Sequence, residues 1–253
     1  MRKSLVGRAA LFSLCLLPFS LAGGYFTAKM SVSTLDQAVI DQAVAQLGSV
    51  EAATWITAAQ AVVYALVLGF FGYMLAEKIG LMRPIRFDGR IVAWVVIASL
   101  IGGVVLSLDQ WTFGRWIPQV GASYEGAGRF DATVWLASVF YGGVIEEVMM
   151  RLFFMSLISF LGWKLFFRSR AYPPMGVFIA ANVIAALLFA AAHLPATQMQ
   201  LGELTPLILL RCFLLNGAFG LLFGRIYRKY GIQYAMLSHV LFHVVSRTIW
   251  LLA

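Results

Sequence analysis

The chain has 253 residues, of which 61% are hydrophobic and 12% are charged, and its formal net charge is +8. A soluble domain carries about twice that charged fraction, so the composition excludes an ordinary soluble globular protein. The basic residues stand in short clusters between apolar runs, a pattern that indicates membrane topology and not a nucleic-acid-binding patch. The two cysteines, Cys15 and Cys212, lie in apolar segments and provide neither a disulfide framework nor the spacing of a metal site.

Seven apolar runs follow one another along the chain, each near or above the roughly 18 residues that cross a bilayer as a helix. They cover residues 7–26, 54–77, 91–108, 131–163, 176–194, 204–226 and 232–252. The fourth is the longest, and is either one tilted helix or two segments that meet near Gly142 and Gly143. We predict an all-α, polytopic transmembrane bundle of about seven spans. Residues 27–52 are predicted to be external, with a short surface helix.

Every second connection between these runs is basic, and the alternate connections are acidic or nearly neutral. The basic connections hold four clusters in chain order: Arg2, Lys3 and Arg8 before the first run; Lys78, Arg83, Arg86 and Arg90 after the second; Lys164, Arg168 and Arg170 after the fourth; and Arg225, Arg228 and Lys229 after the sixth. The positive-inside rule is therefore satisfied at every loop if the N-terminus is inside and the C-terminus outside. We predict a multi-pass protein of the plasma membrane. Residues 1–22 also resemble a cleavable signal peptide, but their loss would break this alternation.

Once the residues at the ends of the runs are assigned to the connections, eight acidic, basic or histidine residues remain inside the predicted spans. A charge at mid-bilayer costs at least about 2.5 kcal/mol, so each of them needs a partner or a purpose. They are Glu146, Glu147, Arg151, His193, Arg211, His239, His243 and Arg247. All three histidines of the chain are in this set, whereas histidines that serve only packing would also occur in loops.

The two adjacent acids are expected to differ in role. On a helix, Glu147 and Arg151 are four residues apart with the acid first, the favourable orientation for an ion pair. Glu146 points about 100° away and is free to face a cavity as a general acid or base. From these residues alone, a purely structural polar knot explains the sequence equally well.

The histidines lie on two further runs. His193 ends a small-residue segment and shares a helix face with Asn182 and Phe189, where a packing role is the simpler explanation. His239 and His243 are four residues apart and lie on one face, a spacing that suits either a metal ion or an interhelical hydrogen-bond pair. Together, the acids and imidazoles form a set that can activate water and stabilise an oxyanion.

In type and order these motifs resemble the CPBP family of intramembrane proteases, also called the ABI or CAAX-protease and bacteriocin-processing family. The matching motifs are Glu146-Glu147-x-x-x-Arg151, Phe189-x-x-x-His193 and His239-x-x-x-His243. The resemblance covers about residues 131–250 and implies a catalytic core over 131–253, with N-terminal transmembrane helices and an external segment over 1–130.

The resemblance implies hydrolysis of peptide bonds within the membrane. Glu146 and His193 would activate the attacking water, and His239 with His243 would stabilise the tetrahedral oxyanion. The expected partners are the lipid bilayer and a peptide or membrane-protein substrate, including prenylated (CAAX-type) ones. The alternative, from another class, is a proton-coupled transporter or a non-catalytic membrane scaffold.

Two positions depart from the family pattern. Leu152 follows the arginine where glycine is frequent, and His243 stands where asparagine is common. The resemblance gives Glu147 and Arg151 a supporting role. The additional imidazole makes a divalent metal such as zinc a possible cofactor, and its ligands would be Glu146, His193, His239 and His243.

Two further expectations concern geometry. His239 lies about 10 Å from the inner end of its run and His193 about 25 Å from the inner end of its own, so they meet only if the helices are staggered, tilted or broken. Arg247 either receives a substrate carboxylate or extends to the outer surface, and its nearness to the C-terminus favours the second.

Overall fold

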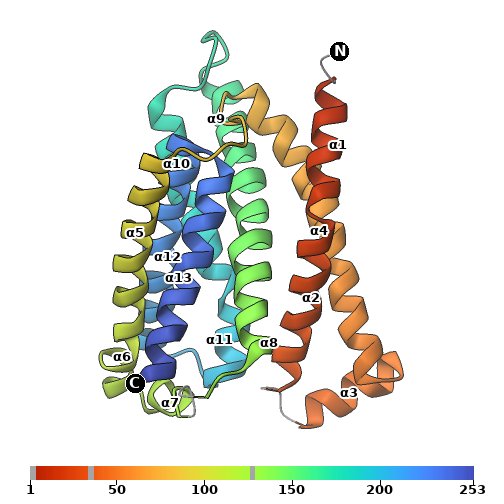
Figure 1. The fold of residues 1–253 in the computed structure, drawn as a ribbon, viewed down its shortest axis with the longest axis vertical. Helices are drawn as coiled ribbons and strands as arrows, with labels where there is room; N and C mark the ends of the chain where they lie inside the picture. The colour runs from red at the N-terminus through yellow and green to blue at the C-terminus, as the bar shows by residue number, and fades with distance from the viewer. Residues whose placement is uncertain (1–3, 34–36, 126–128) are drawn as a thin grey trace.

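The computed structural model describes residues 4–33, 37–125 and 129–253. Every regular element in these ranges is a helix, which confirms the all-α prediction. Arg2 and Lys3, which contribute to the predicted topology, lie outside the described residues. The start of the first described helix and the C-terminus lie at opposite ends of the bundle (Figure 1).

The described residues up to Ser107 form five helices. They are α1 (Leu5–Cys15), α2 (Leu17–Val32), α3 (Gln37–Leu47), α4 (Val50–Lys78) and α5 (Gly89–Ser107). The side chain of Ser49 caps α4 and that of Asp88 caps α5, because each accepts hydrogen bonds from free backbone N–H groups of the first turn. Helix α2 extends to Val32, so residues 27–32 belong to it and not to the predicted external segment. Helix α3 buries no residue.

Short elements lead from α5 to a long central helix. They are η1 (Leu108–Gln110), α6 (Phe113–Trp116) and α7 (Pro118–Ser123). The central helix is built from α8 (Ala132–Ala137), the π-helical segments η2 (Ser138–Ile145) and η3 (Val148–Met155), and α9 (Ser156–Phe166). The fourth apolar run is therefore one distorted helix and not two segments that meet at the glycines.

Four helices complete the chain: α10 (Met175–Ala192), α11 (Leu194–Leu201), α12 (Pro206–Tyr230) and α13 (Ile232–Leu252). Six segments among the described residues are long and apolar enough to cross a membrane. They are Leu5–Val32, Val50–Lys78, Gly89–Trp116, Met175–Leu201, Pro206–Tyr230 and Ile232–Leu252. With the central helix they correspond to the seven predicted runs. The protein is an integral, multi-pass membrane protein.

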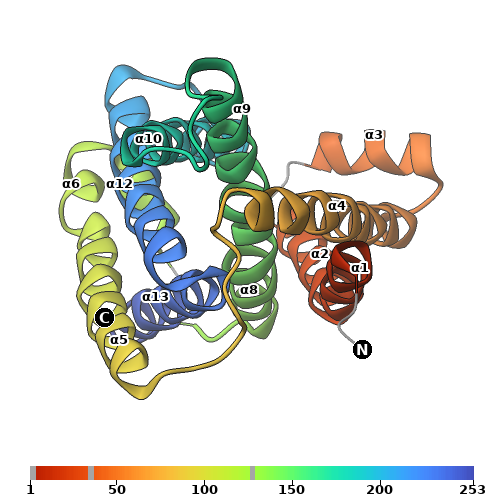
Figure 2. The same ribbon diagram turned by 90° about the horizontal axis from the view of Figure 1, so that it is seen from above.

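The central helix separates two groups of helices. Viewed from above, α1 to α4 lie on one side, and α5, α10, α12 and α13 lie on the other (Figure 2). Helix α4 packs on η3, α2 on η2, and α13 on η2 and α5. Because both groups contact the central helix, residues along it can be buried inside the bundle. The outer helices expose apolar side chains to lipid.

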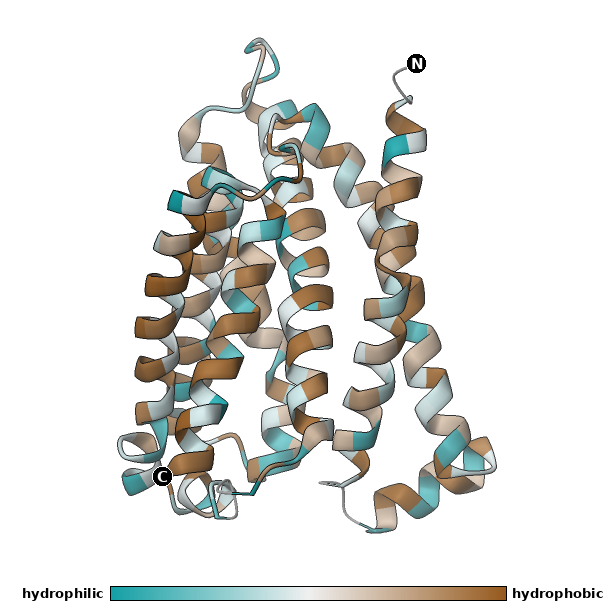
Figure 3. Ribbon diagram, viewed as in Figure 1, coloured by the Kyte–Doolittle hydropathy of each residue, from teal (hydrophilic) through white to brown (hydrophobic). Residues whose placement is uncertain are grey.

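The hydropathy pattern agrees with a membrane location. Apolar residues follow the middle of the helices, and polar residues gather mainly at their ends and in the loops (Figure 3). Ile97, Ile101 and Val104 on α5 are exposed, as lipid-facing side chains are. One end of the bundle holds the start of α1, the 79–88 loop and the start of α13, and most basic residues lie there (Figure 1). That this end faces the inside of the cell stays a prediction.

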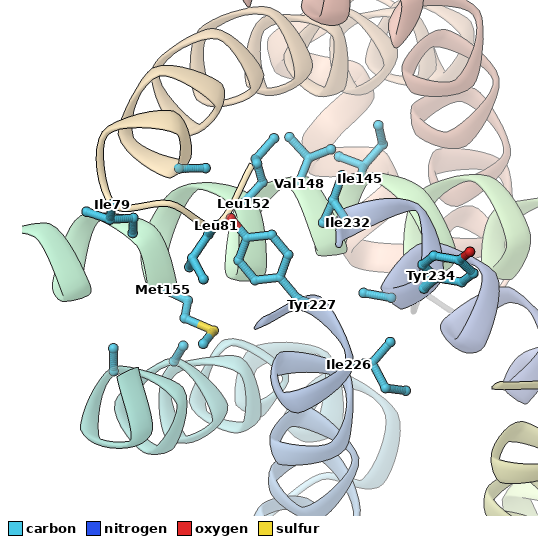
Figure 4. Packing of buried hydrophobic residues seen from close by; sticks show 14 of the residues in the cluster. Ile79, Leu81, Ile145, Val148, Leu152, Met155, Ile226, Tyr227, Ile232 and Tyr234 are labelled. Atoms are coloured by element: carbon cyan, nitrogen blue, oxygen red, sulfur yellow. The ribbon is translucent and has the colours of Figure 1, made fainter. Parts of the chain in front are cut away.

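One buried apolar cluster holds the central helix against its neighbours. Ile145, Val148, Leu152 and Met155 pack with residues of α12, α13 and the start of the 79–88 loop, which include Ile79, Leu81, Ile226, Tyr227, Ile232 and Tyr234 (Figure 4). Leu152, which replaces the glycine frequent in the family, is fully buried in this cluster. Ile145 and Val148 flank the two glutamates in sequence, so the cluster holds the central helix in place at the position of these acids.

Candidate active site

A cavity of about 660 Å³ lies between the central helix and α2, α4, α10, α12 and α13. The four side chains predicted to be catalytic, Glu146, His193, His239 and His243, all line it. The rings of Phe189 and His239 are 6.1 Å apart, so the sites on α10 and α13 meet although they lie at different distances from their helix starts. The helices are therefore offset or tilted, as the sequence required.

The two adjacent glutamates separate as predicted. Glu146 is partly exposed and lines the cavity, whereas Glu147 is completely buried and does not. Both lie at the junction of the π-helical segments η2 and η3. Each π turn adds one residue to a helical turn, and such turns are frequent at functional sites. One short stretch thus directs one carboxylate to the cavity and the other into the protein.

Glu147 lies at the centre of a buried charge cluster. Its Oε1 is 3.0 Å from Nη1 of Arg151, which is the predicted ion pair. The same oxygen accepts a hydrogen bond of 2.9 Å from Nδ1 of His239. Arg151 also donates to the carbonyl of Gly220, and its guanidinium lies 4.5 Å from the ring centroid of Phe189. No local sequence pattern indicates the contact between Glu147 and His239, because the two residues are 92 positions apart.

The histidine pair on α13 is held by close packing. The rings of His239 and His243 stack with centroids 4.8 Å apart, and Phe223 stacks on the other side of His239 at 4.4 Å. Gly142 on the central helix makes room for His243, since a Cβ there would lie 2.8 Å from its Nε2. With Nδ1 of His239 bonded to Glu147, its Nε2 is the nitrogen left for the cavity.

His193 lies where α10 ends and α11 begins. Its Nδ1 is 2.7 Å from the backbone carbonyl oxygen of Phe189. A carbonyl only accepts, so Nδ1 carries the proton in the neutral ring and Nε2 has a free lone pair. The Phe189 of the motif therefore sets the tautomer of His193 through its backbone. Asn182, which shares the sequence face, bonds instead to the carbonyl of Leu221.

The described side chains do not form a ready-made metal-binding group. Within residues 4–33, 37–125 and 129–253, no three His, Cys, Asp or Glu side chains are grouped so that they could hold one ion. In two of the four suggested ligands, His239 and His193, Nδ1 is engaged by Glu147 and by a carbonyl, so Nε2 is the ring nitrogen that remains available.

The other two membrane arginines differ from each other. Arg211 forms a two-pronged pair with Asp109, which the sequence had assigned to a loop but which is 1% exposed. Arg247 lines the cavity and donates from Nε to Oγ of Ser138 at 2.8 Å. Its side chain thus faces the cavity, in contrast to the favoured expectation that it extends to the outer surface.

Sequence reasoning missed several polar residues of the cavity wall. Asn216 on α12, Tyr64 on α4, and Tyr141 and Ser138 on the central helix all line it. Asn216 donates to the carbonyl of Cys212, so its amide is already engaged in its own helix. Each of these residues stands alone in an apolar run and belongs to no motif, so only the packing of the helices reveals it.

A comparison with protein families finds a match over the part of the chain that holds the central helix and α10 to α13. Residues 128–245 match the family described as type II CAAX prenyl endopeptidase Rce1-like. The chain carries an Rce1-like domain. The matched segment includes every residue predicted to be catalytic, and Arg247 lies just beyond it. No curated protein and no solved structure matches the chain significantly. The Rce1-like family indicates a CAAX-type intramembrane protease, with a lipid bilayer around it and a peptide as substrate.

Proposed function

We propose that this Rce1-like protein hydrolyses a peptide bond of a membrane-associated or prenylated (CAAX-type) substrate by means of Glu146 and the three histidines. The observation that carries the proposal is the separation of the two glutamates. One carboxylate faces a cavity together with three imidazoles, and the other is buried and holds one of those imidazoles in place.

In the first step, a water molecule lies between the carboxylate of Glu146 and Nε2 of His193. Glu146 takes one proton as the water oxygen forms a bond to the substrate carbonyl carbon. The Nε2 lone pair of His193 accepts a hydrogen bond from the same water and orients it, which is the role left by the bond of Nδ1 to the carbonyl of Phe189. The carbonyl oxygen then becomes an oxyanion.

In the second step, α13 stabilises this oxyanion. His239 donates from Nε2 when its ring is protonated, and the carboxylate of Glu147 at Nδ1 stabilises that imidazolium. His243, stacked on His239, supplies a second N–H. When the tetrahedral intermediate collapses, the C–N bond breaks and the proton held by Glu146 passes to the leaving amine.

The test uses the full-length protein in lipid vesicles. A prenylated peptide with a CAAX-type C-terminus and the same peptide without the prenyl group are incubated with it, and the products are identified by mass spectrometry. We expect cleavage, with loss of at least about 100-fold in rate in Glu146→Gln and His193→Ala. Glu203→Gln, which changes an exposed carboxylate outside the cavity, is the matched control and keeps the wild-type rate.

Two results would overturn the proposal. One is cleavage by folded Glu146→Gln and His193→Ala at the rate of the wild type. The other is the absence of cleavage of both peptides by the wild-type protein.

A further inference from the structure

A second cavity lies at the basic end of the bundle. It is formed by the 79–88 loop, the end of α12 and the starts of α5 and α13, and its volume is about 410 Å³. This volume is within the range of pockets that bind small ligands. The second cavity shares no lining residue with the cavity of the proposed active site, so a role for it is independent of the proposed reaction.

The wall of the second cavity carries an excess of positive charge. Arg83, Arg86 and Lys229 line it, and among the described residues none of the three forms an ion pair. Asp88 also lines it, but its Oδ1 is engaged by α5, because it accepts hydrogen bonds from two backbone N–H groups at the start of that helix. Three cations thus face one carboxylate, which favours an anionic ligand.

Two buried side chains of α13 hold the loop that carries the arginines. Gln233 is 7% exposed, and its Nε2 donates to the backbone carbonyls of Pro84 and Arg86. The hydroxyl of Tyr234 is also buried and accepts a hydrogen bond of 2.6 Å from the backbone N–H of Asp88. Because these bonds end on backbone atoms of the loop, they fix its path and leave the arginine charges available to a ligand.

The first turn of α13 adds two further features to the wall. The side chain of Gln233 lines the cavity, and its buried Oε1 has no hydrogen-bond partner within the described residues. Gly231, at φ 110°, precedes the helix and provides no side-chain cap, so the positive end of the helix dipole is not neutralised there. These features suit a ligand with a negative charge and a hydroxyl group that can donate to Oε1.

The surroundings of the second cavity favour a lipid over a free anion. Ile85 and Phe87 stand beside the arginines in the loop, and both are exposed. Trp94, Ile97 and Ile101 are exposed as well and share one face of α5, which leads from the cavity toward the middle of the bundle. A phospholipid whose headgroup fills the cavity can therefore place its acyl chains along this apolar face.

We propose that the second cavity binds the headgroup of an anionic phospholipid, with Arg83, Arg86 and Lys229 as the partners of its phosphate. An arginine binds phosphate through two parallel hydrogen bonds, and the lysine adds a point charge. Basic pockets between membrane helices are suited to such headgroups. The bound lipid joins the 79–88 loop to the start of α13, about two helical turns before His239.

The test titrates the full-length protein in a neutral detergent with phosphatidylglycerol, phosphatidylcholine or glycerol 1-phosphate. Native mass spectrometry counts the bound molecules, and the unfolding temperature is measured in the same samples, because a ligand of the folded state raises it. We expect phosphatidylglycerol to bind about 10- to 100-fold more tightly than the zwitterionic phosphatidylcholine and to raise the unfolding temperature. Glycerol 1-phosphate, which has the phosphate and the hydroxyls but no acyl chains, is expected to have no effect at the same concentrations.

Variants of the two arginines are expected to remove this preference. Arg83→Gln and Arg86→Gln each lower the affinity for phosphatidylglycerol about fivefold, and the double variant lowers it about 25-fold. Both side chains are exposed, and the bonds that fix the loop involve its backbone, so the variants keep the fold. The matched control is the double variant Arg168→Gln/Arg170→Gln. It removes two exposed cations at the same end of the bundle, outside the cavity, and keeps the wild-type affinity (Figure 1).

Three results would overturn this inference. Equal affinity of the wild type for phosphatidylglycerol and phosphatidylcholine would remove the recognition of charge. Equal losses in the arginine double variant and in its control would mean that the whole basic end attracts anionic lipid and that the cavity is not a site. Binding of glycerol 1-phosphate as tight as that of phosphatidylglycerol would assign the cavity to a soluble phosphate compound. None of these measurements uses peptide cleavage, so a failure of the proposed function leaves the inference intact.

Discussion

Among the described residues, two arginine–carboxylate pairs have a fully buried carboxylate, and they differ in how many hydrogen bonds each carboxylate oxygen accepts. Asp109 binds Arg211 through both carboxylate oxygens and accepts a third hydrogen bond from the hydroxyl of Tyr124. Glu147 concentrates its contacts with Arg151 and His239 on Oε1, and its Oε2 is buried without a hydrogen-bond partner among the described residues.

The two clusters also differ in whether they include a residue that lines the cavity. Burial and the adjacent Asp109 carboxylate raise the pKa of Tyr124, so its hydroxyl remains a donor at neutral pH. The Asp109 cluster can thus join η1, α7 and α12 without needing another ligand. The Glu147 cluster includes the imidazole of His239, which also lines the cavity. The charge of Glu147 therefore acts on a group that can contact a substrate in the cavity.

The largest expected effect is at Glu147. Glu147→Gln keeps the shape but leaves Arg151 as a buried charge without its counterion, and it removes the acceptor that orients His239. We expect a loss of about 3–5 kcal/mol in unfolding free energy and no measurable cleavage. Thermal unfolding in detergent and the peptide assay would measure the two effects. If Glu147→Gln were as stable and as active as the wild type, the Glu147 cluster would not differ in function from the Asp109 cluster.

A smaller effect, confined to rate, is expected at His243. His243→Ala lowers kcat by about 100- to 1,000-fold, because one oxyanion donor is lost. His243→Asn keeps kcat within about tenfold of the wild type, since an amide N–H also donates to an oxyanion. Stopped assays at saturating substrate measure both variants. Equal rates for alanine and asparagine would show that position 243 is not a donor.

At Asp109 we expect a change in stability alone. Asp109→Asn weakens the pair with Arg211, whose side chain is 19% exposed and can be partly solvated, so the expected loss is about 1–3 kcal/mol. Cleavage per folded molecule stays at the wild-type level, because this cluster does not line the cavity. A drop in kcat of the folded variant would place Asp109 in the catalytic machinery.

The smallest expected effect is that of metal removal. Since the described side chains form no group of three ligands, prolonged dialysis against a strong chelator should leave the cleavage rate unchanged. Elemental analysis of the same sample shows whether a metal was present at the outset. Loss of activity that is restored by zinc would mean that the four cavity residues rearrange around an ion.

The sequence predicted the parts of this molecule that depend on local spacing. The spans follow from apolar length, and the Glu147–Arg151 pair and the outward turn of Glu146 follow from helical periodicity. The bonds of His239 to Glu147, Arg247 to Ser138 and Arg211 to Asp109 join residues about a hundred positions apart. They depend on helix offsets and on the π-helical distortion of the central helix, which composition does not reveal.

The central claim is that Glu146 and not Glu147 activates the water. Its most direct test is the single-turnover cleavage rate of purified Glu146→Gln, with the unfolding temperature of the same sample measured in parallel. We predict a protein as stable as the wild type, because Glu146 is in none of the ion pairs formed by the described residues, and a rate at least about 100-fold lower. A wild-type rate in this variant would contradict the account.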